Sequence, residues 1–257
     1  MFTDSHAHLT HSSVIDHVEA MLQRAKQHKI GTIVNICTDY ESLQKGLLLR
    51  ERHDTVFNAA AVTPHDVEKI GEIFFPEVAT CAREGKILAI GETGLDYHYE
   101  HSPREMQKRF LDHHLNLAVE ADLPLIFHCR EAFEDLFERV GKYQAAVLHC
   151  FTGTLEEAKK CLDKGWMISF SGIVTFKNSA ALREVARFVP LDSILIETDT
   201  PYLAPLSKRG KMCEPAYVIE TAQVVADVKG VGLEEVAFAT SKNADKLFHF
   251  PKHTNPV

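Results

Sequence analysis

The chain has 257 residues, of which 45% are hydrophobic and 25% are charged, and its formal net charge at neutral pH is −8. This composition is typical of a globular protein that is large enough to bury a core without disulfide crosslinks. The negative charge argues against a protein that holds DNA through a broad basic face, because nonspecific DNA affinity comes mainly from lysine and arginine. An acidic chain can still act on nucleic acid where bound metal ions supply local positive charge.

The cysteines and the N-terminus indicate the cellular setting. Six cysteines, at positions 37, 81, 129, 150, 161 and 213, form no Cys-x-x-Cys pair, so neither a zinc ribbon nor a redox motif is predicted. Met1–His8 lacks the charged leader and apolar core of a signal peptide. No apolar run reaches the roughly 18 residues that a membrane span requires. We expect a cytoplasmic protein with free thiols and no membrane contact, and we expect it to be a monomer.

Eight short apolar runs alternate with amphipathic segments and are predicted to be buried parallel strands. In chain order they are Met1–Thr3, Gly31–Cys37, Val56–Val62, Ile87–Gly91, Pro124–Phe127, Ala145–Leu148, Trp166–Phe170 and Ile194–Ile196. The intervening segments are predicted to be helices, among them Val14–Gln27, Arg104–Ala121, Leu155–Leu162, Ala180–Phe188, Pro215–Val228 and Leu233–Phe248. Ser102 is the expected N-cap of the second of these, with Pro103 at the first helical position.

Eight strands, each followed by a helix, predict an α/β protein with a single (β/α)8 TIM-type barrel domain over residues 1–257. An open doubly wound sheet is the alternative, because periodicity does not show whether the sheet closes.

Potential metal ligands follow five of the predicted strands. They are His6 and His8 after the first strand, Glu92 after the fourth, His128 after the fifth, His149 after the sixth and Asp199 after the eighth. The carboxyl ends of the strands of a parallel barrel meet on one face. Four imidazoles and two carboxylates are therefore predicted to share one pocket.

This set of side chains suits divalent metal ions such as zinc, manganese or magnesium. His6 and His8 are two residues apart in a strand, so they point to the same side and can bind one ion together. Glu92 is the natural candidate to bridge two ions about 3.5–4 Å apart, a pair that stabilises displacement at phosphorus and lowers the pKa of a bound water. Asp199 could combine metal binding with general-base catalysis.

Other histidines and cysteines have simpler explanations. A lone histidine at a strand end is more often structural than a ligand, and eight others are assigned to structural or surface roles: His11, His17, His28, His53, His113, His114, His249 and His253. Cys129 and Cys150 could be soft ligands, but adjacent strand residues point to opposite sides, which favours packing.

At these residues the sequence resembles the TatD family of metal-dependent deoxyribonucleases, and matching segments cover nearly the whole chain. They are Asp4-Ser5-His6-Ala7-His8-Leu9, Gly91-Glu92-Thr93-Gly94-Leu95-Asp96-Tyr97, Phe127-His128-Cys129-Arg130, His149-Cys150-Phe151-Thr152-Gly153, Glu197-Thr198-Asp199-Thr200-Pro201-Tyr202-Leu203-Ala204-Pro205, and Arg209-Gly210-Lys211 with Glu214-Pro215-Ala216-Tyr217-Val218. Each segment is fairly specific, and their shared order is very specific.

The resemblance implies a barrel, two divalent metal ions and hydrolysis of DNA phosphodiester bonds, with single strands or DNA ends as substrate. By position, one metal would be held by His6, His8, Glu92 and Asp199, and the second by Glu92, His128 and His149. Glu92 and Asp199 would also be the catalytic residues.

Several further side chains have two interpretations each. Arg130 has no apolar role at a strand end, so it binds substrate phosphate or forms a surface ion pair. For Arg209 and Lys211 a solvated loop is favoured over phosphate contact. Tyr97 and Tyr202 stack on a base or pack at the rim, and Asp96 orients a ligand or caps a turn.

The sequence departs from the family after the third strand. The stretch Ala61-Val62-Thr63-Pro64-His65 stands where the family often has Gly-x-His-Pro-His, so Thr63 replaces the first histidine, and Cys213 stands where asparagine is common. The metal ligands are all present, so hydrolysis is expected, with Thr63 a candidate to alter substrate choice or rate.

Three functions fit this sequence. The first is a nuclease; the second is a metal-dependent ester or amide hydrolase, such as an aminoacyl-tRNA deacylase, since the fold does not fix the substrate. The third is a binding protein without catalysis, against which the complete ligand set argues, because burying these groups without metal is costly. No lysine lies at a strand end as a bridging carbamate candidate, which favours the TatD type over carbamate-bridged amidohydrolases.

Overall fold

A computed structural model describes residues 1–251, in which eight parallel strands form one sheet whose spatial order is their order along the chain. The strands are β1 (Phe2–Ala7), β2 (Ile30–Cys37), β3 (Val56–Ala60), β4 (Ala89–Asp96), β5 (Leu125–Arg130), β6 (Ala146–Leu148), β7 (Met167–Phe170) and β8 (Ile194–Ile196). Their parallel sequential pairing is what strand–helix repeats with short connections produce.

The first and last strands meet, so the sheet forms a nearly closed barrel. A parallel bridge joins Ala7 to Thr200. The His8 amide donates to the Thr200 carbonyl at 2.7 Å, and the Asp199 amide donates to the His6 carbonyl at 2.9 Å. The predicted (β/α)8 barrel is confirmed, and the open doubly wound alternative is wrong.

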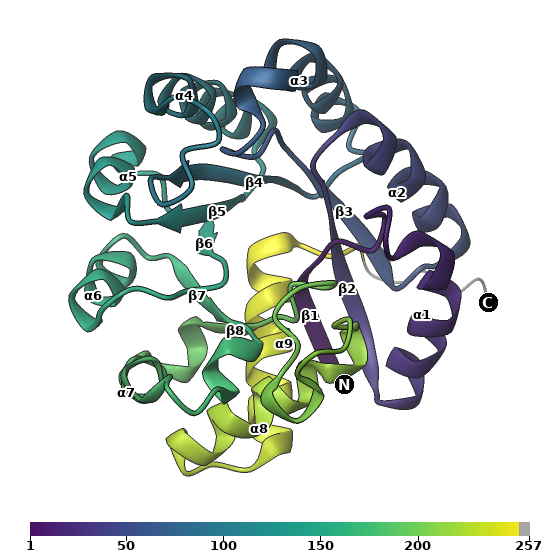
Figure 1. The fold of residues 1–257 in the computed structure, drawn as a ribbon, viewed down its shortest axis with the longest axis vertical. Coiled ribbons are helices and arrows are strands. Elements are labelled where there is room, and N and C mark those ends of the chain that lie inside the picture. The colour runs from purple at the N-terminus through teal and green to yellow at the C-terminus, as the bar shows by residue number, and fades with distance from the viewer. Residues whose placement is uncertain (252–257) are drawn as a thin grey trace.

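Helices surround the barrel (Figure 1). They are α1 (Val18–Gln27), α2 (Tyr40–Arg52), α3 (Val67–Arg83), α4 (Arg104–Ala121), α5 (Phe133–Val140), α6 (Leu155–Asp163), α7 (Ala180–Phe188), α8 (Val218–Lys229) and α9 (Leu233–Phe248). Single 3-10 turns, Ile15–His17 and Pro215–Tyr217, precede α1 and α8, so the predicted helices there begin as 3-10 turns. Within residues 1–251, no helix combines the length and apolarity needed to cross a membrane.

The barrel interior and the layer beneath the helices form separate hydrophobic cores. The interior contains one apolar residue or more from most strands, including Val34, Ile126 and Leu195, and it packs against Leu247 and Phe248 of α9. Helix α9 therefore covers the end of the barrel at which the strands begin. The opposite end, where the strands finish, is left for polar side chains.

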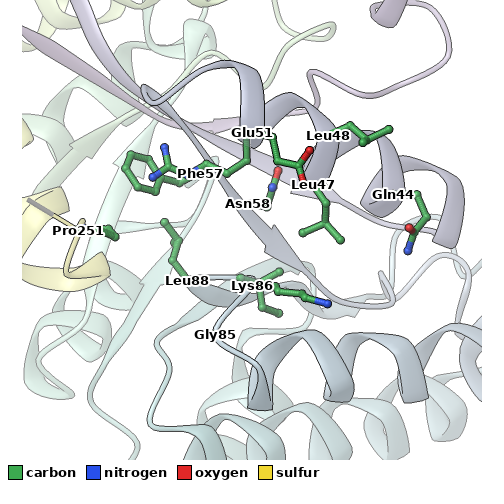
Figure 2. A pocket seen from close by; sticks show the side chains of 12 residues that line it. Gln44, Leu47, Leu48, Glu51, Phe57, Asn58, Gly85, Lys86, Leu88 and Pro251 are labelled. Carbon is green, nitrogen blue, oxygen red and sulfur yellow. The ribbon is translucent and has the colours of Figure 1, made fainter. Parts of the chain in front are cut away.

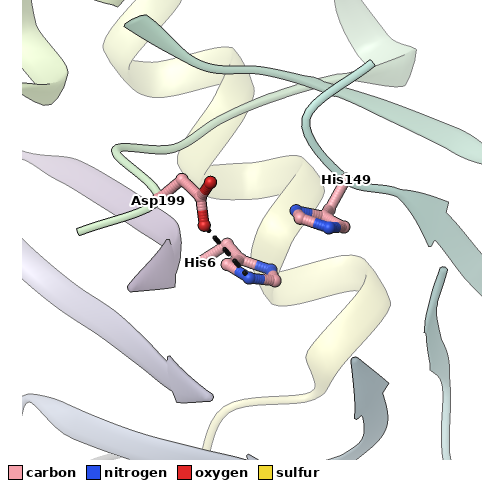
Figure 3. A group of neighbouring side chains, drawn as sticks. All are labelled: His6, His149 and Asp199. Carbon is pink, nitrogen blue, oxygen red and sulfur yellow. Dashed lines mark ion pairs between the residues drawn. The ribbon is translucent and has the colours of Figure 1, made fainter. Parts of the chain in front are cut away.

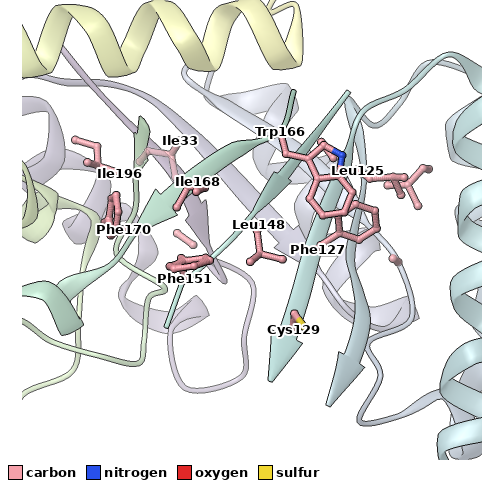
Figure 4. Packing of buried hydrophobic residues seen from close by; sticks show 14 of the residues in the cluster. Ile33, Leu125, Phe127, Cys129, Leu148, Phe151, Trp166, Ile168, Phe170 and Ile196 are labelled. Atoms are coloured by element: carbon pink, nitrogen blue, oxygen red, sulfur yellow. The ribbon is translucent and has the colours of Figure 1, made fainter. Parts of the chain in front are cut away.

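The larger core lies between the strands and the outer helices, and Figure 4 shows the part along β5 to β7. The rings of Phe127 and Trp166 lie 4.9 Å apart, and the Trp166 indole nitrogen donates to the Tyr143 carbonyl. Burying a large apolar side chain contributes roughly 1.5–3 kcal/mol. These contacts join the middle of β5 to the residues that lead into β6 and β7.

Three strands extend further than the apolar runs predicted. β1 continues to Ala7, β4 to Asp96 and β5 to Arg130, each past the last apolar residue of its run. The backbone ladder continues while the side chains become polar, so a criterion based on apolar runs ends each strand too early. As a result His6, Glu92 and His128 lie within strands, which fixes their direction more firmly than a loop would.

The predicted N-cap at Ser102 is wrong. Pro103 occupies the N-cap of α4. The Ser102 hydroxyl donates to the His65 carbonyl at 2.9 Å and accepts from the Glu68 amide at 3.2 Å. It thereby binds an otherwise unpaired amide in the first turn of α3, because packing brings the two helix starts together.

Candidate metal centre

The six predicted metal ligands lie together where the strands finish. His6 lies near the end of β1 with His8 just beyond it, Glu92 in β4, His128 in β5, His149 directly after β6 and Asp199 three residues after β8. His6, Glu92, His149 and Asp199 are buried, and His8 and His128 are half-buried. The set therefore forms one buried cluster that is open on one side.

A break in the β4–β5 register positions Glu92. Gly91 pairs with Ile126 and Thr93 with Phe127, so Glu92 is the extra residue of a bulge. A bulge redirects a side chain relative to a regular strand. Two residues later the strands approach so closely that a Cβ on Gly94 would lie 1.9 Å from the His128 carbonyl oxygen. Glycine at 94 is therefore required for β4 and β5 to bring Glu92 and His128 together.

The first group of donor atoms consists of His6, His8, Glu92 and Asp199. The two Nε2 atoms of His6 and His8 are 3.3 Å apart. Asp199 Oδ1 lies 3.6 Å from His6 Nε2 and 3.5 Å from His8 Nε2, and Glu92 Oε2 lies 3.6 and 3.7 Å from the same two atoms. Two ligands about 2.1 Å from a tetrahedral ion would be about 3.4 Å apart, so this spacing fits a divalent cation.

The second group uses the other oxygen of the same glutamate. Glu92 Oε1 lies 2.9 Å from His128 Nδ1 and 3.0 Å from His149 Nε2. One carboxylate thus faces a different pair of imidazoles with each oxygen, as a carboxylate that bridges two ions would. The ligand atoms of His6, His8 and Glu92 all lie within 4.8 Å of one another, as do those of Glu92, His128 and His149. Asp199 forms such a cluster with His6 and His149, and no cluster in the described part of the chain contains a cysteine.

The electrostatics of the cluster also suit cations. Burial by itself would raise the pKa of the Glu92 carboxyl, but the surrounding imidazoles, above all His149, hold it well below its ordinary value. Burial and the neighbouring His149 lower the pKa of His6 to about 4, so this imidazole is neutral at neutral pH, the form that binds metal. The His6 and His149 rings stack 3.9 Å apart beside Asp199 (Figure 3).

Two carboxylates contact the histidines on the side away from Glu92: Asp96, for which the sequence left open orienting a ligand or capping a turn, and Glu197, to which the sequence assigned no role. His128 Nε2 lies 2.9 Å from Asp96 Oδ2. His149 Nδ1 lies 3.3 Å from Glu197 Oε1, which also accepts the Cys150 amide at 2.7 Å. Such partners orient metal-binding imidazoles and fix their tautomer. Asp96 also accepts the His98 and Tyr99 amides through Oδ1, so it caps this turn in addition to contacting His128.

Asp4 joins the first strand to the segment after the last. Its Oδ1 accepts the Thr198 amide at 2.9 Å and the His6 amide at 3.3 Å, and its Oδ2 accepts the Thr198 hydroxyl at 2.6 Å. Burial raises the pKa of this carboxyl to about 8. Asp4 thereby fixes the spacing between His6 and Asp199, two predicted ligands far apart in the sequence.

The cluster opens into a cavity of about 760 Å³ on the carboxyl-end face of the barrel. Arg130 is the only lysine or arginine lining it, and within residues 1–251 no carboxylate forms an ion pair with this guanidinium. Tyr202 lies at the rim and is 49% exposed. Tyr97 does not line the cavity, since its hydroxyl donates to Asp135 at 2.6 Å.

The remaining predicted side chains lie elsewhere. Arg209 packs over the Phe176 ring at 4.8 Å, and neither Arg209 nor Lys211 lines the cavity. Cys129 is buried and Cys150 half-buried, and all six cysteines are free thiols. His253 lies outside the described residues.

A second cavity, of about 480 Å³, lies where β3 and β4 begin, between α2 and the segment before β4 (Figure 2). Its lining includes Leu47, Phe57 and Leu88 and none of the six clustered ligands. Because it lies at the opposite end of the strands from the cluster, it does not contribute to the metal centre.

Fold and cluster together define a metal-dependent hydrolase built on a (β/α)8 barrel. The family model described as TatD related DNase matches residues 3–249, and the chain belongs to this family. It is 37% identical over 252 residues to the uncharacterized metal-dependent hydrolase YabD of Bacillus subtilis, covering 96% of this chain and 99% of that protein.

Two further comparisons agree with this assignment. The chain is 32% identical over 255 residues to the 3'-5' ssDNA/RNA exonuclease TatD of Pantoea ananatis, covering 95% of this chain and 98% of that protein. Among solved structures, the TatD homologue YJJV from Escherichia coli superposes with a TM-score of 0.91 at 29% identity, covering 97% of this chain and 98% of the other.

Proposed function

We propose that this protein is a nuclease that hydrolyses phosphodiester bonds of single-stranded DNA or DNA ends with two divalent metal ions, magnesium, manganese or zinc. The main support for two ions is that the two carboxylate oxygens of Glu92 face different pairs of histidines. Its Oε2 faces His6 and His8, and its Oε1 faces His128 and His149. A cluster built for one ion has no need of two such groups.

Each side chain has a proposed role. His6, His8, Glu92 and Asp199 would hold one ion, and Glu92, His128 and His149 the second. When bound, two such ions neutralise charge on the phosphate and make water available as a nucleophile near neutral pH. Asp96 and Glu197 hold the imidazoles of His128 and His149 in the orientation that this requires.

Asp199 is the proposed general base. Its carboxylate lies at the cavity, beside His6 and His8, and can accept the proton of the attacking water. The water oxygen forms a bond to phosphorus while the bond from phosphorus to the leaving sugar oxygen breaks. The leaving oxygen takes up a proton, so the products are a phosphate monoester and a free hydroxyl.

Nucleic acid is the favoured substrate for two reasons. Arg130 lines the cavity and forms no ion pair with a carboxylate among residues 1–251, and guanidinium groups match phosphate geometry. A relative with 32% identity is named a 3'-5' ssDNA/RNA exonuclease. A net charge of −8 is compatible with this substrate, because the bound ions and Arg130 supply the local positive charge.

The test is hydrolysis of a short end-labelled single-stranded DNA by the purified protein with magnesium, manganese or zinc, or with EDTA. Asp199→Asn is assayed alongside, with Asp245→Asn on the exposed face of α9 as the matched control. We expect metal-dependent cleavage that the first substitution removes and the second leaves intact. The product ladder shows whether cleavage starts from an end.

Absence of cleavage with every metal, in protein shown by elemental analysis to bind two ions, would overturn the nuclease proposal. The same site would then act on carbon, and aminoacyl esters and amides become the substrates to assay. Thr63 would be the first residue to examine, because it lines the cavity where the family often has histidine.

A further inference from the structure

An exposed aromatic pair forms the rim of the cavity on the side of β4. Tyr99 and His101 stack with ring centroids 5.3 Å apart and an interplanar angle of 7°. Tyr99 is 52% exposed, and both rings line the cavity. Flat aromatic faces exposed beside a phosphate-binding site are the usual platforms for nucleobases.

We propose that Tyr99, supported by His101 and Arg130, is a stacking subsite for the base of one nucleotide next to the scissile phosphate. This inference rests on the proposed nuclease function and specifies its substrate as a strand whose bases are unpaired. A base in a duplex is stacked on its neighbours and has no free face to offer the ring.

Arg130 links the aromatic pair to the phosphate. Its guanidinium carbon lies 4.7 Å from the centroid of the Tyr99 ring, and the side chain extends from the end of β5, two residues after His128. A guanidinium held over a ring keeps its outward N–H groups free for a phosphate oxygen. The base and its phosphate would therefore meet adjacent groups that already contact each other.

Asp96 connects the loop that carries Tyr99 to His128 of the proposed metal centre. Its Oδ1 accepts the amides of His98 at 3.0 Å and Tyr99 at 2.8 Å, while its Oδ2 lies 2.9 Å from His128 Nε2. On either side of Tyr99, His98 pairs with Glu131 and Glu100 pairs with Arg104. A loop held at these points presents its ring at a set distance from the ligands, and such preorganisation lowers the cost of binding.

A second aromatic surface lies across the cavity. In a ring of eight strands in sequence order β4 is opposite β8, and Figure 1 shows them on opposite sides of the barrel. Tyr202 follows β8, and its ring lies 5.9 Å from that of His11. With the metal ligands between the two surfaces, a phosphate at the centre would have room for a base on each side.

The experiment measures whether Tyr99 and a particular base act together. Cleavage of a single-stranded oligonucleotide is compared with cleavage of the same strand carrying one tetrahydrofuran abasic site, moved one position at a time. Tyr99→Leu, Tyr99→Phe and the wild type are assayed, with Phe238→Leu on α9, where the ring is 70% exposed, as the matched control.

One abasic position should raise the KM of the wild type roughly tenfold, the scale of a lost base–aromatic stack. Tyr99→Leu should raise the KM for the intact strand by a similar factor and show no further penalty at that position. Tyr99→Phe should restore the wild-type pattern, and Phe238→Leu should match the wild type throughout. A Tyr99→Leu enzyme with wild-type KM, or with the full abasic penalty retained, would overturn the subsite.

Binding separates this inference from the proposed function. Affinity for the same strands is measured by fluorescence anisotropy in the Asp199→Asn background. If the wild type cleaves DNA but the abasic penalty does not depend on Tyr99, the subsite is refuted and the nuclease proposal is not. Binding that depends on Tyr99 but no cleavage by the wild type refutes the nuclease and leaves the subsite, and neither binding nor cleavage refutes both.

Discussion

The carboxylate of Glu197 supports the imidazole of His149, with Glu197 Oε1 lying 3.3 Å from His149 Nδ1. The opposite ring nitrogen, Nε2, lies 3.0 Å from Glu92 Oε1. Glu197 is fully buried, and it also accepts the amide of Cys150, the residue after the histidine. It therefore fixes both the ring and the backbone that carries it, which leaves Nε2 as the atom available for a metal ion.

We expect Glu197→Gln to weaken the affinity for the second metal ion by about 10- to 100-fold, the range found for partners that orient metal ligands. A glutamine can still occupy the space with its oxygen accepting both N–H groups, as Glu197 Oε1 does, but a neutral amide is a weaker acceptor than a carboxylate. Its NH2 group would also take the position of Oε2, which is buried without a hydrogen-bond partner among residues 1–251. Competition with a chromogenic chelator measures the affinity directly, without reference to turnover.

The matched control for this substitution is Glu214→Gln, a buried carboxylate that pairs with Arg24 away from the cluster. It should lower stability without changing metal affinity. Equal metal affinity in Glu197→Gln and the wild type would show that Glu197 has only a packing role.

The fold was predictable because each buried strand is marked by an apolar run within its own few residues. β8 has the predicted bounds, Ile194–Ile196, since an unbroken apolar run defines a strand buried on both faces. β4 was predicted to stop at Gly91 but continues to Asp96. Its last residues mix glycine and polar side chains around a bulge, and only pairing with β5 shows that they are still a strand.

The site was predictable in part for a related reason. The six clustered side chains follow recognisable strand ends, whereas Glu197 acts on a histidine 48 residues away and becomes significant only once β6 and β8 are close in the barrel. Its position directly after Ile196, the last residue of β8, was an available signal, because the clustered side chains were recognised by following strand ends. No pattern marks Tyr99, and the tyrosines that the sequence offers for stacking or rim packing are Tyr97 and Tyr202.

Stability at acidic pH should depend on His114, which lies outside the metal centre. This ring is fully buried, its Nε2 accepts the Val62 amide at 3.3 Å, and its Nδ1 lies 2.8 Å from the Thr93 hydroxyl. Burial, with a smaller contribution from His113, lowers the pKa of His114 from 6.5 to about 3. Between these values the unfolded chain binds a proton that the folded protein does not, so stability is present above pH 6.5 and falls as the pH decreases.

In metal-free protein, we expect the wild type to lose about 1.4 kcal/mol more unfolding free energy than His114→Gln for each pH unit below 6.5. Urea denaturation at several pH values between 7.5 and 5 gives the difference, in which the titration of the other histidines cancels. His28→Gln, at an exposed position, should follow the wild type. Parallel curves for wild type and His114→Gln would contradict the assignment.

Arg130→Ala should raise the KM for single-stranded DNA roughly tenfold and make binding less dependent on salt, because one phosphate contact is lost. Arg209→Ala removes the same charge from a residue that packs on Phe176 outside the cavity, so it controls for net charge. The measurement is KM at several salt concentrations. An unchanged KM in Arg130→Ala would show that this guanidinium does not contact phosphate.

Thr63 allows stability and substrate recognition to be separated. Its hydroxyl is buried in the cavity wall without a hydrogen-bond partner among residues 1–251. Leaving such a group unsatisfied costs about 1–3 kcal/mol. Thr63→Val should therefore raise the unfolding free energy by about 1 kcal/mol. By contrast, Thr240→Val should not raise it, because the Thr240 hydroxyl donates to the Val236 carbonyl at 2.8 Å.

The same Thr63→Val protein should have an unchanged KM for DNA, because the Thr63 hydroxyl oxygen is buried out of reach of a substrate. Urea denaturation and steady-state kinetics on one preparation give both quantities. A raised KM would show that substrate reaches this hydroxyl and would contradict its burial in the cavity wall. A less stable enzyme would mean that the hydroxyl has a partner, such as an ordered water, and that the cavity wall at β3 is built around it.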